Sequence, residues 1–131
     1  MQNVEIVRGA YERFRVTGRL DAELAAPEFV WDMSHFHGWP EDQVYEGVEG
    51  AEAFLREWGA AWDDWQLDVE ALHEAGETVV ALIRQRGRSR ASGMLVDMSL
   101  AQVWTLRDGK ETRMDMYSSQ AEALEAVGLA G

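Results

Sequence analysis

The chain has 131 residues, of which 47% are hydrophobic, so it is long enough for one domain (1–131) that buries its own core. It has no cysteine, which excludes disulfides, thiolate chemistry and cysteine-rich zinc sites. With 24 acidic and 12 basic residues, the formal net charge of −12 disfavours nucleic-acid binding. The N-terminus lacks a secretory-signal pattern and no apolar run is long enough to span a bilayer, so we expect a cytoplasmic protein without a membrane partner.

The N-terminal segment has the spacing of helices. Apolar residues recur at intervals of three and four between residues 3 and 17: Val4, Val7, Tyr11 and Phe14. This spacing predicts an amphipathic helix that ends near Gly18. We expect a short second helix over about residues 20–26, because a helix should stop before Pro27.

The period changes to two after Glu28. Phe29, Trp31 and Met33 alternate with other residues, which predicts a strand. Strict alternation would turn Asp32 away from the side that Trp31 and Met33 face. Helical spacing returns between residues 50 and 64, with an unusually aromatic face: Ala51, Phe54, Leu55, Trp58 and Trp62.

Strands dominate the second half. We expect strands near residues 65–71, 78–88, 95–106 and 111–117, followed by a short helix within 118–129. The tight turn in RDGK (107–110) favours a hairpin between the last two strands. The order of elements predicts an α+β fold, with helices packed on the concave face of a strongly curved mixed or antiparallel sheet.

Three stretches carry a family resemblance: VEIVRGAYERF (4–14), VYEGVEGAEAFLREW (44–58) and AQVWTLRDGKETRMDMYSSQAEALEAVGL (101–129). They resemble the nuclear-transport-factor-2-like (NTF2-like) superfamily, which includes SnoaL-like polyketide cyclases, ketosteroid isomerase and limonene epoxide hydrolase. The resemblance implies a cone-shaped, cystatin-like roll with one apolar pocket per chain. It also implies a homodimer through the outer sheet face near Val103 and Asp115.

A mostly apolar pocket is expected, with the stretch MSHFHGWPEDQVYEG (33–47) at its mouth. Its expected substrate-binding residues are Trp31, Met33, Trp39, Tyr45, Phe54, Trp58, Met98, Leu100, Gln102, Trp104, Met114 and Met116. The alternative for many of them is that they simply form the core. Such a pocket suits a flat apolar ligand with one or two oxygens, which Gln102 could hold by a hydrogen bond.

Asp32 is the first candidate catalytic residue. The resemblance to ketosteroid isomerase implies a general base on the first strand, where Asp32 falls. The alternative is an Asp that faces outward, which strict alternation favours. His35 and His37 lie two residues apart and could act as acid–base groups or contact the substrate, or they could be solvated. Joined by His73 or a carboxylate they could hold a metal, but we expect neither a metal nor a cofactor.

Arginines recur at period two in RQRGRSR (84–90). Arg84 either projects into the pocket and binds an anionic oxygen, as the resemblance to limonene epoxide hydrolase implies, or pairs with acidic residues in solvent. We expect pairing in solvent for Arg86, Arg88 and Arg90. Arg86 and Met116 stand where the epoxide hydrolase would have its two Asp residues, which argues against epoxide hydrolysis by that mechanism.

Three functions remain open from the sequence. The first is an enzyme that performs acid–base chemistry on an apolar ring or polyketide-like carbonyl compound, as an isomerase, cyclase or dehydratase without a cofactor. The second is a protein that binds an apolar ligand without changing it. The third is a dimeric scaffold whose own Met and Trp side chains fill the cavity.

Overall fold

The computed structural model describes residues 2–37 and 44–129. The elements in chain order are α1 (Asn3–Thr17), β1 (Ala25–His35), β2 (Val44–Glu46), α2 (Gly47–Ala60), β3 (Trp62–Ala75), β4 (Thr78–Ser89), β5 (Leu95–Arg107), β6 (Lys110–Tyr117) and α3 (Gln120–Ala126). In these two ranges, no helix combines the length and hydrophobicity that crossing a membrane requires.

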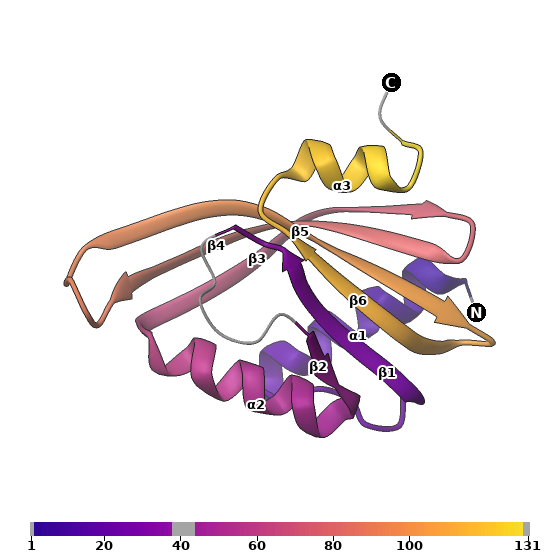
Figure 1. Cartoon of the computed structure of the whole chain (residues 1–131), viewed down its shortest axis with the longest axis horizontal. Helices are drawn as coiled ribbons and strands as arrows, with labels where there is room; N and C mark the ends of the chain where they lie inside the picture. The colour runs from indigo at the N-terminus through magenta and orange to yellow at the C-terminus, as the bar shows by residue number, and fades with distance from the viewer. Residues whose placement is uncertain (1, 38–43, 130–131) are drawn as a thin grey trace.

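The six strands form one mixed sheet in the order β2-β1-β6-β5-β4-β3. β1 and β6 are parallel, while the other neighbouring strands are antiparallel. The sheet is strongly twisted, with α1 and α2 on one face and α3 on the opposite face (Figure 1). The predicted α+β fold is therefore confirmed, with the difference that the C-terminal helix covers the outer face.

The main core lies between the sheet and the helices α1 and α2. Its most completely buried large side chains come from both helices and four strands: Val7, Phe29, Met33, Phe54, Val79, Ile83, Leu100, Leu106 and Met114. A smaller apolar cluster forms under α3 on the outer face, where Ala123 packs with Val80, Ala101 and Val103. The strands β4 and β5 are consequently apolar on both faces over part of their length.

Two predicted elements are wrong. Residues 22–24 form a turn and β1 begins at Ala25, so no helix spans 20–26. The reason is tertiary pairing, because Ala25 is paired with Glu111 of β6 and the Glu111 N–H donates to the Leu24 carbonyl at 2.8 Å. The aromatic helix ends at Ala60, which places Trp62 on β3 rather than on the helix face.

Candidate functional site

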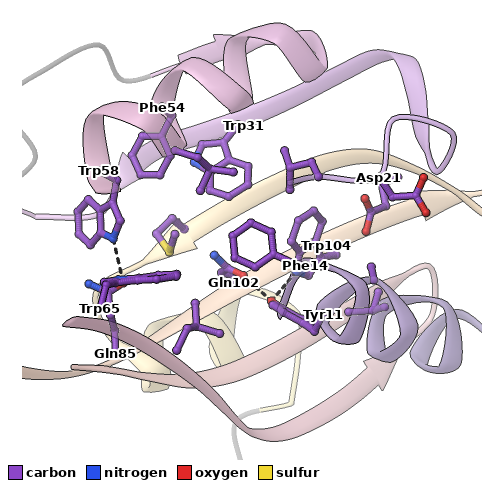
Figure 2. Close-up of a pocket in the computed structure, with 17 residues that line it drawn as sticks. Tyr11, Phe14, Asp21, Trp31, Phe54, Trp58, Trp65, Gln85, Gln102 and Trp104 are labelled. Carbon is purple, nitrogen blue, oxygen red and sulfur yellow. Dashed lines mark hydrogen bonds between the residues drawn. The ribbon is translucent and has the colours of Figure 1, made fainter. Parts of the chain in front are cut away.

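A cavity of about 50 Å³ lies between α1, α2 and the sheet. It is lined by Val7, Ala10, Tyr11, Phe14, Leu20, Asp21, Trp31, Phe54, Leu55, Trp58, Trp65, Leu67, Gln85, Gln102, Trp104, Glu111 and Met116. Figure 2 shows the aromatic rings of both helices and the sheet directed toward this space. Most of the wall is apolar, and the few polar groups are spaced around it, as in typical small-molecule sites.

A larger groove of about 590 Å³ adjoins the cavity between α1, α2 and β3. Six residues line both spaces: Tyr11, Phe14, Leu55, Trp58, Trp65 and Leu67. The cavity by itself holds only a few water molecules, so a ring-sized ligand would occupy the groove and place one end in the cavity.

The expected pocket residues fall into two groups. Six of them line the cavity: Trp31, Phe54, Trp58, Gln102, Trp104 and Met116. Five others pack in the core without lining it: Met33, Tyr45, Met98, Leu100 and Met114. Trp39 lies outside the described residues, and the described part of 33–47 does not line the cavity or the groove.

A hydrogen-bonded chain fixes the polar wall of the cavity. Trp104 Nε1 donates to the Tyr11 hydroxyl at 2.8 Å, and this hydroxyl donates to Gln102 Oε1 (Figure 2). Trp58 Nε1 donates to Gln85 Oε1 at 3.0 Å. Because an indole nitrogen can only donate, these bonds orient both amide oxygens. Among the described residues, neither amide nitrogen is found to donate a hydrogen bond, and both side chains line the cavity.

Glu111 is the buried carboxyl of the cavity. It is 6% exposed, and its Oε2 has no hydrogen-bond partner among the described residues. Burial raises the pKa of Glu111 to about 7, the nearby Asp21 carboxylate raises it further, and Arg13 opposes the change. A carboxyl with this pKa exchanges protons readily at neutral pH.

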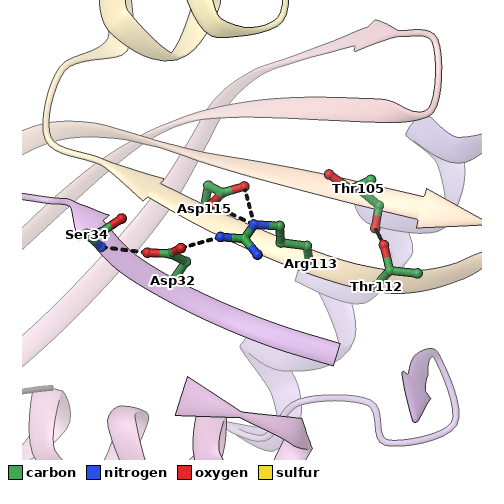
Figure 3. A network of polar contacts seen from close by, with 6 residues as sticks. All are labelled: Asp32, Ser34, Thr105, Thr112, Arg113 and Asp115. Atoms are coloured by element: carbon green, nitrogen blue, oxygen red, sulfur yellow. Dashed lines mark hydrogen bonds and ion pairs between the residues drawn. The ribbon is translucent and has the colours of Figure 1, made fainter. Parts of the chain in front are cut away.

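A bulge between β5 and β6 turns Glu111 inward. The register shifts between the pairs Thr105–Arg113 and Leu106–Glu111, where the Thr112 hydroxyl donates to the Thr105 carbonyl at 3.2 Å (Figure 3). Regular alternation would put Glu111 on the same outer side as Arg113 and Asp115. The sequence does not indicate this direction of Glu111, because Lys110–Tyr117 contains no glycine or proline that signals a bulge.

Residues of α1 and of the turn that follows it were also missed. Tyr11 and Phe14 were predicted as the apolar face of a helix, but they line the cavity. Asp21 lies in the segment predicted as a second helix, where it pairs with Arg13 at 3.0 Å. The amphipathic pattern identified the correct face of α1, but it does not distinguish core contacts from cavity contacts.

The raised pKa of Glu111 should make the free energy of unfolding depend on pH. Its folded pKa of about 7 lies above the usual 4.5, so between these values the folded state binds a proton that the unfolded state releases, and stability falls as pH rises. The shift corresponds to about 3 kcal/mol lost between pH 4.5 and 7. Urea unfolding of wild type and Glu111→Gln across this range should show this difference, and parallel curves would contradict it.

Asp32 lies on the sheet face opposite the cavity. Its carboxylate pairs with Arg113, which also contacts Asp115, and accepts a hydrogen bond from the Ser34 N–H at 2.7 Å (Figure 3). Burial acts to raise the pKa of Asp32, but the hydrogen bonds from Ser34 and the charge of Arg113 bring it below its usual value. Strict alternation thus correctly indicated the direction of this side chain.

Neither candidate histidine lines the cavity. The register of β1 and β6 shifts between Asp32 and His35, and the His35 ring stacks on Tyr117 with centroids 4.5 Å apart. His37 is exposed, and its backbone N–H donates to Ser118 Oγ at 3.3 Å. In the part of the chain that the structure describes, no three His, Asp or Glu side chains are grouped so that they could hold a metal ion.

Of the two alternatives for Arg84, the structure shows pairing with an acidic residue in solvent. Arg84 is exposed and binds Asp97 through its Nε at 2.8 Å, whereas the neighbouring Gln85 lines the cavity. The sequence pattern of β4 does not show which side chains face the cavity, because residues 79–83 are apolar on both faces of the strand. One face packs under α1 and α2, and the other packs under α3. Arg86 and Arg90 pair with acidic residues as expected, Asp68 and Asp63 respectively.

This chain matches one family model and several solved structures. The family model described as SnoaL-like domain matches residues 7–114. An NTF2-like protein from Burkholderia thailandensis E264 is 25% identical, with a TM-score of 0.76 over 89% of this chain and 91% of that one. A protein named as a SnoaL-like polyketide cyclase from Jannaschia sp. CCS1 is also 25% identical, with a TM-score of 0.72 over 98% and 92% of the two chains.

A third solved structure, TerC co-crystallised with polyporic acid, is 23% identical with a TM-score of 0.72 over 95% of this chain and 96% of that one. No match was found among curated proteins. The family model covers most of the chain. The chain therefore belongs to the SnoaL-like family, within the NTF2-like fold.

Proposed function

We propose that the protein binds a small, largely apolar ring compound in the cavity and groove and catalyses proton transfer on it, with Glu111 as the acid–base group. The observation that carries the proposal is the position of Glu111, a buried carboxyl in an aromatic cavity with one oxygen unpartnered among the described residues. Buried carboxyls with raised pKa values are characteristic of catalytic acid–base groups.

The cavity supplies the groups that this chemistry needs. The rings of Trp31, Trp58 and Trp104 give an apolar wall for a flat ligand. The amide nitrogen of Gln102 can donate to a carbonyl oxygen and stabilise the negative charge that develops when a neighbouring carbon loses its proton. Glu111 would take that proton and return it elsewhere, a step that isomerisation, cyclisation and dehydration share.

The comparisons support binding of a small molecule. A protein of the same fold was co-crystallised with polyporic acid, and another is named as a polyketide cyclase. Together with the cavity of this chain, they favour an apolar ring or polyketide-like carbonyl compound as the ligand class.

Deuterium exchange tests the proposal directly. 2-Tetralone is a flat apolar ring ketone with acidic hydrogens beside its carbonyl, and NMR in D₂O follows their exchange. We expect wild-type protein to accelerate the exchange above the rate in buffer alone, with saturation as 2-tetralone is increased. Exchange at the buffer rate, although 2-tetralone quenches tryptophan fluorescence on binding, would contradict catalysis and leave a binding function.

Non-catalytic binding is the second candidate. It is favoured because Asp21, the other carboxyl of the cavity, is engaged by Arg13, which leaves Glu111 as the single free acid–base group among the described lining residues. Native mass spectrometry of freshly purified protein should then release a compound that stays chemically unchanged after long incubation with the protein. Recovery of a converted product would reject this candidate.

The homodimer through the outer face also remains a proposal. In the single chain, Val103 is only 5% exposed because it packs in the apolar cluster under α3. Asp115 forms an ion pair with Arg113. A dimer would therefore use the sheet surface beside α3 rather than Val103 itself. Light scattering at micromolar concentration should give twice the mass of the chain, and a monomer mass would reject the dimer.

A further inference from the structure

The charged groups of the cavity all have one sign. Asp21 and Glu111 line it, and no Lys, Arg or His is found among its lining residues in the described chain. Arg13 reaches Asp21 from outside the lining and compensates one of the two charges. Arg15 and Asp68 belong to the outer groove, where opposite charges balance. The inner end of the site is therefore acidic, and an anionic ligand would be repelled there.

Aromatic rings line the same cavity as the two carboxyls. Seven of them line the cavity: Tyr11, Phe14, Trp31, Phe54, Trp58, Trp65 and Trp104. The faces of such rings carry partial negative charge and attract ammonium groups, most strongly when water is excluded. Aromatic walls and a carboxyl together recognise organic cations, because the rings contact the carbon body while the carboxylate balances the charge.

No hydrogen-bond donor among the described residues reaches Glu111 Oε2. Its Oε2 is buried without a hydrogen-bond partner among these residues, although the side chain lines the cavity. An unpartnered buried acceptor costs free energy that a ligand with N–H groups would recover. A carbonyl or carboxylate of a ligand has no proton to donate, so it cannot fill this role while Glu111 is ionised.

We propose that the ligand of this site is an amine with an apolar ring body, bound with its protonated nitrogen against Glu111 and its ring among the tryptophans. This inference rests on the proposed function insofar as both place the ligand in the cavity beside Glu111. It goes further by naming the ligand's charge and the atom that Glu111 meets. The side chain is then the counter-ion of the bound amine as well as the group that can exchange its proton.

Binding of an amine should release a proton from the protein. Glu111 faces Asp21, Arg13 and Tyr11, and its pKa of about 7 keeps most of it protonated at pH 6.5. An adjacent ammonium favours the carboxylate and lowers this pKa, so the proton leaves when the amine binds. A neutral ligand of the same shape gives no such release.

Calorimetry with three ligands on one ring tests the inference. The probes are 2-aminotetralin, 2-tetralol and tetralin-2-carboxylate, titrated into wild-type protein at pH 6.5 in two buffers of different ionisation enthalpy. We expect the amine to bind at least ~10-fold more tightly than the alcohol, with the carboxylate weakest. The apparent enthalpy for the amine alone should depend on the buffer, which reports the released proton.

Two variants distinguish binding of the amine at Glu111 from nonspecific attraction of a cation to an acidic protein. Glu111→Gln should remove the proton release and bring the affinities of amine and alcohol to within about 2-fold of each other. Glu125→Gln makes the same chemical change on exposed α3 and should leave both properties at their wild-type values.

Each outcome decides between the two proposals. Binding of the alcohol or the carboxylate as tightly as the amine would overturn the amine inference and leave the ring-binding function standing. Amine binding that Glu111→Gln does not change would also overturn it. Failure of all three ligands to bind, at concentrations where circular dichroism shows folded protein, would reject both the inference and the ring-binding pocket.

Discussion

Glu111→Gln is expected to lower the rate of 2-tetralone deuterium exchange by ~100-fold or more, the usual contribution of a general acid–base group. The amide has nearly the shape of the carboxyl but cannot accept the proton. Because the substitution leaves the apolar wall in place, we expect the apparent affinity for 2-tetralone to change by less than about 3-fold. NMR exchange rates at a series of ketone concentrations separate the two quantities.

Matched variants make this result specific. Glu125→Gln, on the exposed surface of α3, should exchange at the wild-type rate. Asp32→Asn tests the base that the resemblance to ketosteroid isomerase implies, and it should retain most of the activity because Asp32 lies on the opposite sheet face. Loss of exchange in Asp32→Asn, with full activity in Glu111→Gln, would return the role of base to Asp32.

Phe54→Ala is expected to destabilise the folded protein by ~3–5 kcal/mol, the range for truncating a buried phenylalanine. Phe54 is 1% exposed, and its ring contacts Trp31, Tyr45 and Trp58, with centroids 5.2, 5.5 and 5.7 Å away. Truncation removes these contacts and enlarges the cavity between α2 and the sheet. Urea denaturation followed by circular dichroism measures the loss.

Two further variants bracket this effect. Val16→Ala on α1 removes an apolar side chain that is 86% exposed, and it should change the unfolding free energy by less than about 0.5 kcal/mol. Phe54→Leu keeps much of the apolar volume and should fold even if Phe54→Ala does not, with an intermediate loss of stability. A loss for Phe54→Ala no larger than that for Val16→Ala would contradict close packing at this site.

The site was only partly predictable from the residues. Trp31, Phe54 and Trp104 were expected at the pocket because large apolar side chains at strand or helix spacing face the same interior. Gln102 was found because it is the polar residue in an otherwise apolar inward series on β5. Glu111 was not found, because its direction depends on how β6 pairs with β5 rather than on its own neighbours in sequence.

Local sequence determined the fold class and most of the element order. Hydrophobic periods of 3.6 and 2 distinguish helices from strands, since they are fixed by the geometry of the backbone itself. The same patterns indicated the inward face of α1 and the outward direction of Asp32. They failed at 20–26, where pairing with β6 favours a strand from Ala25 over a helix.

Tertiary structure alone decided which polar groups meet in the cavity. The bulge at Thr112 turns Glu111 inward. Because α3 packs on the outer face of β4, residues 79–83 are apolar on both faces of the strand, and their pattern does not indicate which face lines the cavity. Both effects depend on segments far apart in the chain, whereas a hydrophobic period reports only neighbouring residues. For this reason the sequence left Arg84 open as a pocket residue and did not indicate Gln85 or Glu111, both of which line the cavity of the folded chain.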